Sequence, residues 1–128
     1  NANLGYVHAM AHQLGGLYDM PHGVANAVLL PHVARYNLIA NPEKFADIAE
    51  FMGENTDGLS TMDAAELAIH AIARLSADIG IPQHLRDLGV KEADFPYMAE
   101  MALKDGNAFS NPRKGIEKEI AEIFRQAF

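Results

Sequence analysis

The sequence predicts an all-α fold, a helical bundle, and three observations carry that prediction. Apolar residues recur at helical spacing in one segment after another, and no stretch alternates apolar and polar residues for long enough to make a strand. The composition is 49% hydrophobic over 128 residues, which is enough to bury the core of one domain. We therefore expect a single helical domain over residues 1–128.

The first two helices are expected to form a hairpin. A helical pattern begins at Leu4 and reaches Gly15-Gly16, where we expect a break that reverses the chain. His22-Gly23 then opens a second, apolar helix. Pro31 has no N–H to donate, so it is expected to kink or restart this helix. Apolar residues on nearly all of its sides imply that it is buried on nearly all sides.

Two further helices follow from capping and stop signals. Asn41-Pro42 places a capping residue before a proline suited to a first turn, and the apolar period then runs to Gly53. Ser60 and Asp63 resemble a capping box at the start of an alanine-rich helix, which is expected to stop at Gly80.

The last two helices are shorter. Asp94 is expected to cap a helix that ends at Asp105-Gly106-Asn107. A polar loop leads to Asn111-Pro112, and a final amphipathic helix runs from Ile116 to the end of the chain. We therefore expect five or more helices and no substantial sheet, because every clear apolar period in the sequence is near 3.6 residues.

Charge and composition exclude several partners. Ten Lys plus Arg against 17 Asp plus Glu give a net charge of −7, so we expect no nucleic-acid partner. The longest apolar run, residues 24–30, is too short to span a bilayer, so we expect no membrane partner. The absence of cysteine removes thiolate ligands and fits a reducing compartment, and we expect the cytoplasm.

Three histidines within 15 residues are the main chemical signal. His8 and His12 are four residues apart, so a helix places them on one face, and a reversal of the chain would return His22 toward them. Neutral imidazole is a common metal ligand. Spacing alone leaves two interpretations open: a metal site, or hydrogen-bonded histidines with a structural role.

The remaining histidines and the other motifs give little evidence of a chemical function. His32, His70 and His84 are scattered and are interpreted as structural or surface residues. The spacing of His8 and His12 is that of a zinc metalloprotease helix, but Ala9 stands where that chemistry needs a glutamate base. No dinucleotide fingerprint, phosphate-binding loop or Ser/His/Asp signature occurs in the sequence.

Several segments together resemble the iron-containing (group III) alcohol dehydrogenases. They are GYVHAMAHQLGG (5–16), PHGVAN (21–26), LPHVARYN (30–37), DIGIP (78–82), LRDLGV (85–90) and GNAFSNPR (106–113). Residues 16–22 and 102–113 are most similar to the bacterial subfamily that acts on 1,3-propanediol. The resemblance covers essentially the whole chain.

The resemblance implies a two-domain enzyme, of which this chain is the helical C-terminal part. The chain has no initiator Met and no signal-peptide pattern, so we expect it to be a piece of a longer protein whose upstream dinucleotide-binding domain is absent here. The implied activity is NAD-dependent interconversion of 1,3-propanediol and 3-hydroxypropanal. The full enzyme is expected to be a homo-oligomer that takes a small alcohol or aldehyde, and this chain alone is expected to be inactive.

The resemblance also implies roles for individual residues. His8 and His22 match two of the ligands of a divalent iron, while an aspartate and another histidine come from upstream; Zn(II) would fit the same donors. His12 matches a histidine near the nicotinamide that orients substrate or relays a proton, which makes it both the catalytic and the cofactor-binding candidate. Asn107 and Phe109 match a loop near the substrate pocket, although turn chemistry explains them equally well.

Two competing functions remain open from the sequence. One is a non-catalytic helical domain for packing or oligomerisation, in which the histidines are structural. The other is a metal-dependent hydratase or hydrolase built on a histidine-rich helix.

Overall fold

The computed structural model describes residues 5–128, and it confirms the all-α prediction. Over these residues the chain forms six α-helices and no strand. The α-helices are α1 (Gly5–Tyr18), α2 (His22–Asn37), α3 (Pro42–Phe51), α4 (Thr61–Asp78), α5 (Phe95–Lys104) and α6 (Glu117–Gln126). Short 3₁₀ turns lie between them at η2 (Leu85–Leu88), η3 (Glu92–Asp94) and η4 (Gly106–Ser110).

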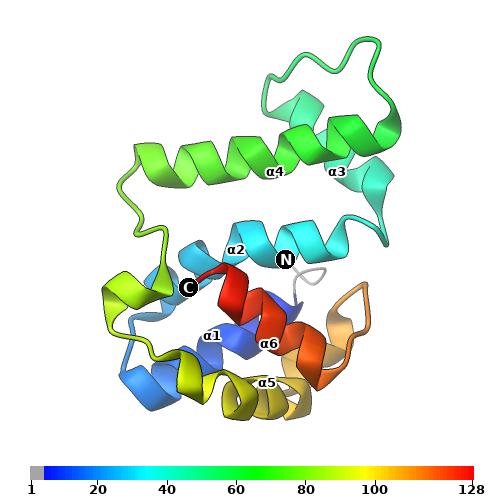
Figure 1. The fold of residues 1–128 in the computed structure, drawn as a ribbon. Coiled ribbons are helices and arrows are strands. Elements are labelled where there is room, and N and C mark those ends of the chain that lie inside the picture. The colour runs from blue at the N-terminus through cyan, green and yellow to red at the C-terminus, as the bar shows by residue number, and fades with distance from the viewer. Residues whose placement is uncertain (1–4) are drawn as a thin grey trace.

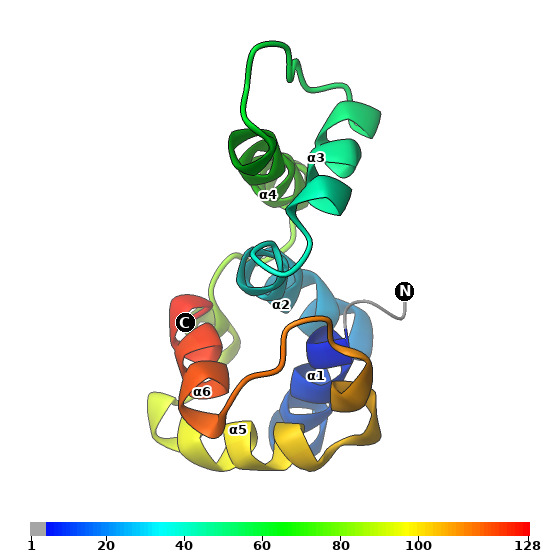
Figure 2. The same ribbon diagram turned by 90° about the vertical axis from the view of Figure 1, so that its right-hand side faces the viewer.

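Helix α2 is the centre of the molecule. On one side of it α1, α5 and α6 pack into the main body, and on the other side α3 and α4 form a hairpin that stands away from that body (Figures 1 and 2). Ala25, Val28 and Leu29 of α2 belong to the main core, whereas Ala34 belongs to the core of the hairpin. The helix was expected to be buried on nearly all sides, and it packs on two cores, but Arg35 is exposed and His32 and Tyr36 are half-buried.

The main core joins the two ends of the chain. Phe95 of α5 stacks on Phe124 of α6 at a ring separation of 5.6 Å, and both rings are fully buried. Met10 and Leu14 of α1 are fully buried in the same core. Full burial of each such side chain contributes about 1.5–3 kcal/mol. This packing fixes α1 against α5, which matters for the site below.

The α1–α2 hairpin forms as expected, but its turn lies elsewhere. The helix continues through Gly15 and Gly16 to Tyr18, so the predicted break at the glycine pair is wrong. The reversal is made by Asp19, whose φ is 52°, and by Pro21, which precedes α2. Aspartate tolerates this left-handed conformation better than most residues. Packing of α1 against the core outweighs the helix cost of two glycines, about 1 kcal/mol each.

Pro31 does not restart α2, which the structure assigns as one helix from His22 to Asn37. Pro31 is buried, and the helix that carries it contributes residues to both cores. Packing on both sides therefore keeps the helix continuous despite the missing hydrogen bond, and the expected interruption is corrected.

Of the three predicted helix caps, one forms its side-chain hydrogen bond and two do not. Ser60 caps α4 as expected, since its hydroxyl accepts a hydrogen bond from the Asp63 N–H at 3.1 Å. Asn41 and Asp94 precede α3 and α5 but make no side-chain capping bond. The Asp94 carboxylate instead accepts a hydrogen bond from the Tyr18 hydroxyl, so a contact with α1 replaces the predicted cap.

A buried asparagine pair ties the loop after α5 to the beginning of α1. Asn111 Oδ1 accepts from the Tyr6 N–H and from Asn37 Nδ2, both at 3.1 Å. Asn111 Nδ2 donates to Asn37 Oδ1 at 2.7 Å and to the Arg113 carbonyl at 2.8 Å. Beside this pair the backbones come so close that a Cβ on Gly5 would lie 2.0 Å from the Asn107 carbonyl oxygen. The loop is thus fixed on α1 by both hydrogen bonds and backbone packing.

Asn111→Ala is therefore expected to destabilise the protein by about 2–4 kcal/mol, because buried donors and acceptors lose their partner. Denaturant unfolding of the full-length protein measures this change. The matched control is Asn55→Ala, which removes an exposed amide that accepts from the Asp57 N–H. Equal stability of the two variants would show that the buried network contributes nothing.

Candidate metal centre

The α1–α2 hairpin brings the three candidate histidines together. His8 and His12 lie one turn apart on α1, and His22 is the first residue of α2. The ring of His22 lies 6.1 Å from that of His8 and 5.7 Å from that of His12, measured between centroids. His8 is half-buried, whereas His12 and His22 are exposed. The hairpin therefore gathers three imidazoles at one place on the surface.

The separation of His8 and His22 is compatible with a shared metal ion. Two imidazoles that bind one ion at 2.0–2.1 Å have ring centroids about 5 Å apart at a tetrahedral angle. The observed separation is 6.1 Å, so a tetrahedral site would need the two rings to approach by about 1 Å. The donors are neutral nitrogen ligands, which suit Fe(II) and Zn(II). Within residues 5–128 no group of three or more His, Asp, Glu or Cys side chains is arranged as a metal site. The assignment of His8 and His22 thus concerns a pair of ligands and not a complete shell.

His12 is distinguished from the other two by a carboxylate partner. Its Nδ1 lies 2.7 Å from Oδ2 of Asp105, the residue that follows α5. Burial raises the pKa of Asp105, but the hydrogen bonds from His12 and from Asn107 outweigh it, so the pKa lies below its usual value. The sequence analysis identified Asp105 only as part of the signal that ends a helix. Ninety-three residues separate it from His12, so no local pattern could have revealed the pair.

Asn107 and Phe109 lie on η4, which begins directly after Asp105. Asn107 donates to Asp105 Oδ1 through its backbone N–H at 2.9 Å and through Nδ2 at 3.0 Å. Its amide therefore serves the turn that holds Asp105. Phe109 is 75% exposed. Their place in a substrate pocket stays a prediction.

One further polar atom lies on the same helix as His22. Asn26 is one turn after His22 on α2, and its Oδ1 is buried with no hydrogen-bond partner among the described residues. The other histidines are elsewhere: His70 and His84 are exposed, and His32 is half-buried. Burial, with smaller effects of Arg35 and His84, holds the pKa of His32 below its usual value.

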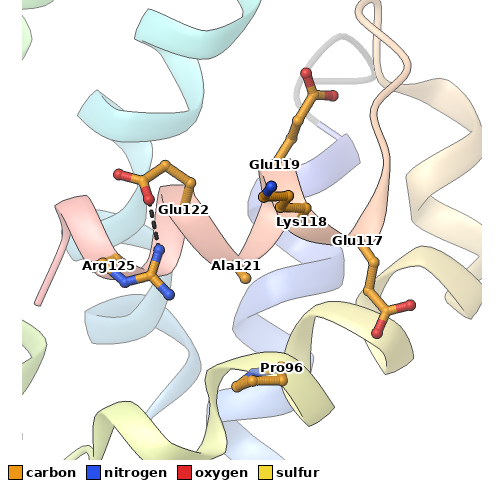
Figure 3. A pocket seen from close by; sticks show the side chains of 7 residues that line it. All are labelled: Pro96, Glu117, Lys118, Glu119, Ala121, Glu122 and Arg125. Carbon is orange, nitrogen blue, oxygen red and sulfur yellow. Dashed lines mark hydrogen bonds and ion pairs between the residues drawn. The ribbon is translucent and has the colours of Figure 1, made fainter.

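A surface pocket of about 690 Å³ lies between α5 and α6, and no histidine lines it (Figure 3). Its lining is Pro96, Glu117, Lys118, Glu119, Ala121, Glu122 and Arg125. Arg125, the guanidinium of this pocket, donates to Glu122 at 2.5 Å and to Glu92 at 3.2 Å. The positive charge of Arg125 is thus paired with two carboxylates. We therefore place the candidate site at the histidines of the α1–α2 hairpin and not in this pocket.

No helix within residues 5–128 combines the length and the apolar character that a bilayer crossing requires.

Known proteins share both the fold and the sequence pattern of this chain. In fold the chain is similar to a crystal structure of 1,3-propanediol oxidoreductase, with a TM-score of 0.97 and 90% identity over 98% of this chain and 33% of that one. This match defines the fold class as that of the helical part of that structure. Residues 1–128 match the Fe-containing alcohol dehydrogenase family, C-terminal, and the chain belongs to that family.

Individual relatives agree with that membership. The chain is 99% identical to 1,3-propanediol dehydrogenase of Citrobacter freundii and 91% identical to that of Klebsiella pneumoniae, in each case over all of its 128 residues. It is 48% identical to lactaldehyde reductase of Escherichia coli strain K12. The chain spans about a third of the length of these curated relatives.

Proposed function

We propose that this chain is the metal-binding helical part of an NAD-dependent alcohol dehydrogenase that interconverts 1,3-propanediol and 3-hydroxypropanal. The observation that carries the proposal is the cluster of His8, His12 and His22, in which one imidazole has a carboxylate partner and two do not. Near-identity to a 1,3-propanediol dehydrogenase supports the choice of substrate. The dinucleotide-binding domain is proposed to precede this chain in the full-length protein.

In this proposal His8 and His22 are two ligands of a divalent iron, and an aspartate and a third histidine upstream complete the set. When bound, the ion supplies a Lewis acid that polarises the alcohol oxygen. The imidazoles of His8 and His22 would hold it as neutral donors, and their rings already face the same place on the surface. Zn(II) would satisfy the same donors, so metal replacement is part of the test.

The other residues handle the substrate. His12 is proposed to orient the alcohol or accept its hydroxyl proton, since Asp105 occupies Nδ1 and Nε2 remains available. Asn107 and Phe109 are proposed to border the substrate pocket, where the exposed ring of Phe109 would exclude water from the reacting alcohol. We further propose that the enzyme is a cytoplasmic homo-oligomer.

The competing functions are less well supported. A non-catalytic packing domain gives no reason for membership of an alcohol dehydrogenase family over all 128 residues. A hydratase or hydrolase is less well supported for the same reason, because the family and the similar 1,3-propanediol dehydrogenase are oxidoreductases.

The full-length protein is expected to reduce NAD when 1,3-propanediol is added, as measured by nicotinamide absorbance. Removal of the metal with a chelator should abolish the reaction, and Fe(II) should restore it in direct comparison with Zn(II). The 128-residue chain, assayed as a control, should bind metal weakly and show no turnover. Absence of alcohol-dependent NAD reduction in the metal-loaded full-length protein would contradict the proposed function.

A further inference from the structure

The contact between His12 and Asp105 joins two distant parts of the chain in a defined geometry. His12 lies on α1 and Asp105 follows α5, and the distance from Nδ1 to Oδ2 is 2.7 Å. An ionised carboxylate has no hydrogen to donate, so Nδ1 of a neutral His12 must be the donor. The other ring nitrogen, Nε2, then carries the lone pair. The contact therefore selects one of the two imidazole tautomers.

Asp105 is itself held in place through its second oxygen. Oδ1 accepts from the backbone N–H and the Nδ2 of Asn107, so both carboxylate oxygens have assigned partners. The Asp105 side chain is 17% exposed, against 45% for His12. Asn107 lies on the loop that Asn111 ties to the beginning of α1. The carboxylate is thus fixed to the same helix that carries the histidine.

We propose that Asp105 is a positioning residue, which holds His12 with Nδ1 protonated so that Nε2 is free to accept the hydroxyl proton of the alcohol. This inference rests on the function proposed above. The alcohol O–H bond breaks and its proton forms a new N–H bond at Nε2. The electron pair left on oxygen forms the carbonyl bond as the C–H bond breaks and its hydride reduces NAD⁺. The imidazolium, paired with Asp105, then returns the proton to water.

A double-mutant cycle in the full-length protein tests this role. Asp105→Asn keeps the size of the side chain and removes its charge, and an amide can donate to Nδ1 and favour the opposite tautomer. We expect Asp105→Asn to lower kcat by about 10–10²-fold, a fraction of the effect of losing a general base. KM and metal content should change less than about twofold. In the His12→Ala background the same substitution should change kcat by less than about twofold, because Asp105 acts only through His12.

Asp94→Asn is the matched control. Asp94 lies at the other end of α5 and also holds α1, through the Tyr18 hydroxyl, but it does not contact His12. It should leave kcat within about twofold of the wild type. Asp105→Glu, which restores the carboxylate, should recover part of the lost kcat.

The opposing results are distinct. Wild-type kcat in Asp105→Asn would overturn the inference and leave the proposed function standing. Full multiplication of the two effects in the double variant, or loss of metal in step with kcat, would also overturn it by showing a role independent of His12. No alcohol-dependent NAD reduction by the wild-type protein would overturn both proposals.

Discussion

Full-length protein with His8→Ala or His22→Ala is expected to lose metal and alcohol oxidation together, because each change deletes an imidazole donor of the proposed site. Lewis-acid stabilisation provides several kcal/mol, so the rate should fall by roughly 10³-fold or more. Metal stoichiometry and nicotinamide absorbance on the same samples measure both effects. The two variants should resemble each other, since either loss leaves a site with one imidazole from this chain.

His70→Ala is the control for these two variants. His70 is an exposed histidine of α4, in the hairpin that stands away from the main body (Figure 2). Its loss should change neither metal content nor rate. Circular dichroism of all three variants separates loss of metal from loss of fold. A folded His8→Ala or His22→Ala variant with full metal content would contradict the ligand assignment.

Local signals predicted the helices well because they depend on residues close together in the chain. The Ser60 hydroxyl and the Asp63 N–H are three residues apart, so the sequence alone could place the beginning of α4. The His8 and His12 pair likewise follows from helical spacing. The return of His22 was expected from a reversal of the chain, and it happens, although with a different turn.

Predictions failed where tertiary packing competes with local preference. Gly15 and Gly16 are poor helix formers, yet the buried face of α1 carries the helix past them to Tyr18. Pro31 lacks one hydrogen bond, yet α2 packs on two cores and continues. Asp94 could cap α5, but the Tyr18 hydroxyl provides another partner. Each failure depends on contacts between residues that are distant in the chain.

The candidate site shows the same division. Its histidines are concentrated in one short segment and could be found from their spacing. Asp105 could not, because its importance arises only when the loop after α5 is packed on α1 and fixed there by Asn111. A carboxylate at a helix end is common, so its position in the sequence does not indicate a functional role until its partner is known.

His12→Ala in the full-length protein is expected to keep most of its metal while kcat/KM falls by about 10²–10⁴-fold, the range for removal of a general acid–base group. That loss corresponds to about 3–5 kcal/mol of transition-state stabilisation. The different role proposed for His12 comes from its match to the family's histidine near the nicotinamide. The Asp105 carboxylate holds Nδ1 of His12, which leaves Nε2 as the nitrogen available for proton transfer.

Metal stoichiometry beside rate for the three alanine variants decides between the roles. If His12 were a ligand, its Nε2 would bind the ion, and His12→Ala would lose metal as fully as His8→Ala. If it were only structural, His12→Ala would keep its rate once folded protein is counted, since the side chain is 45% exposed and fills little of the core. Retained metal with a reduced rate is the combination that neither alternative gives, and it is the result that a proton-relaying or substrate-orienting His12 requires.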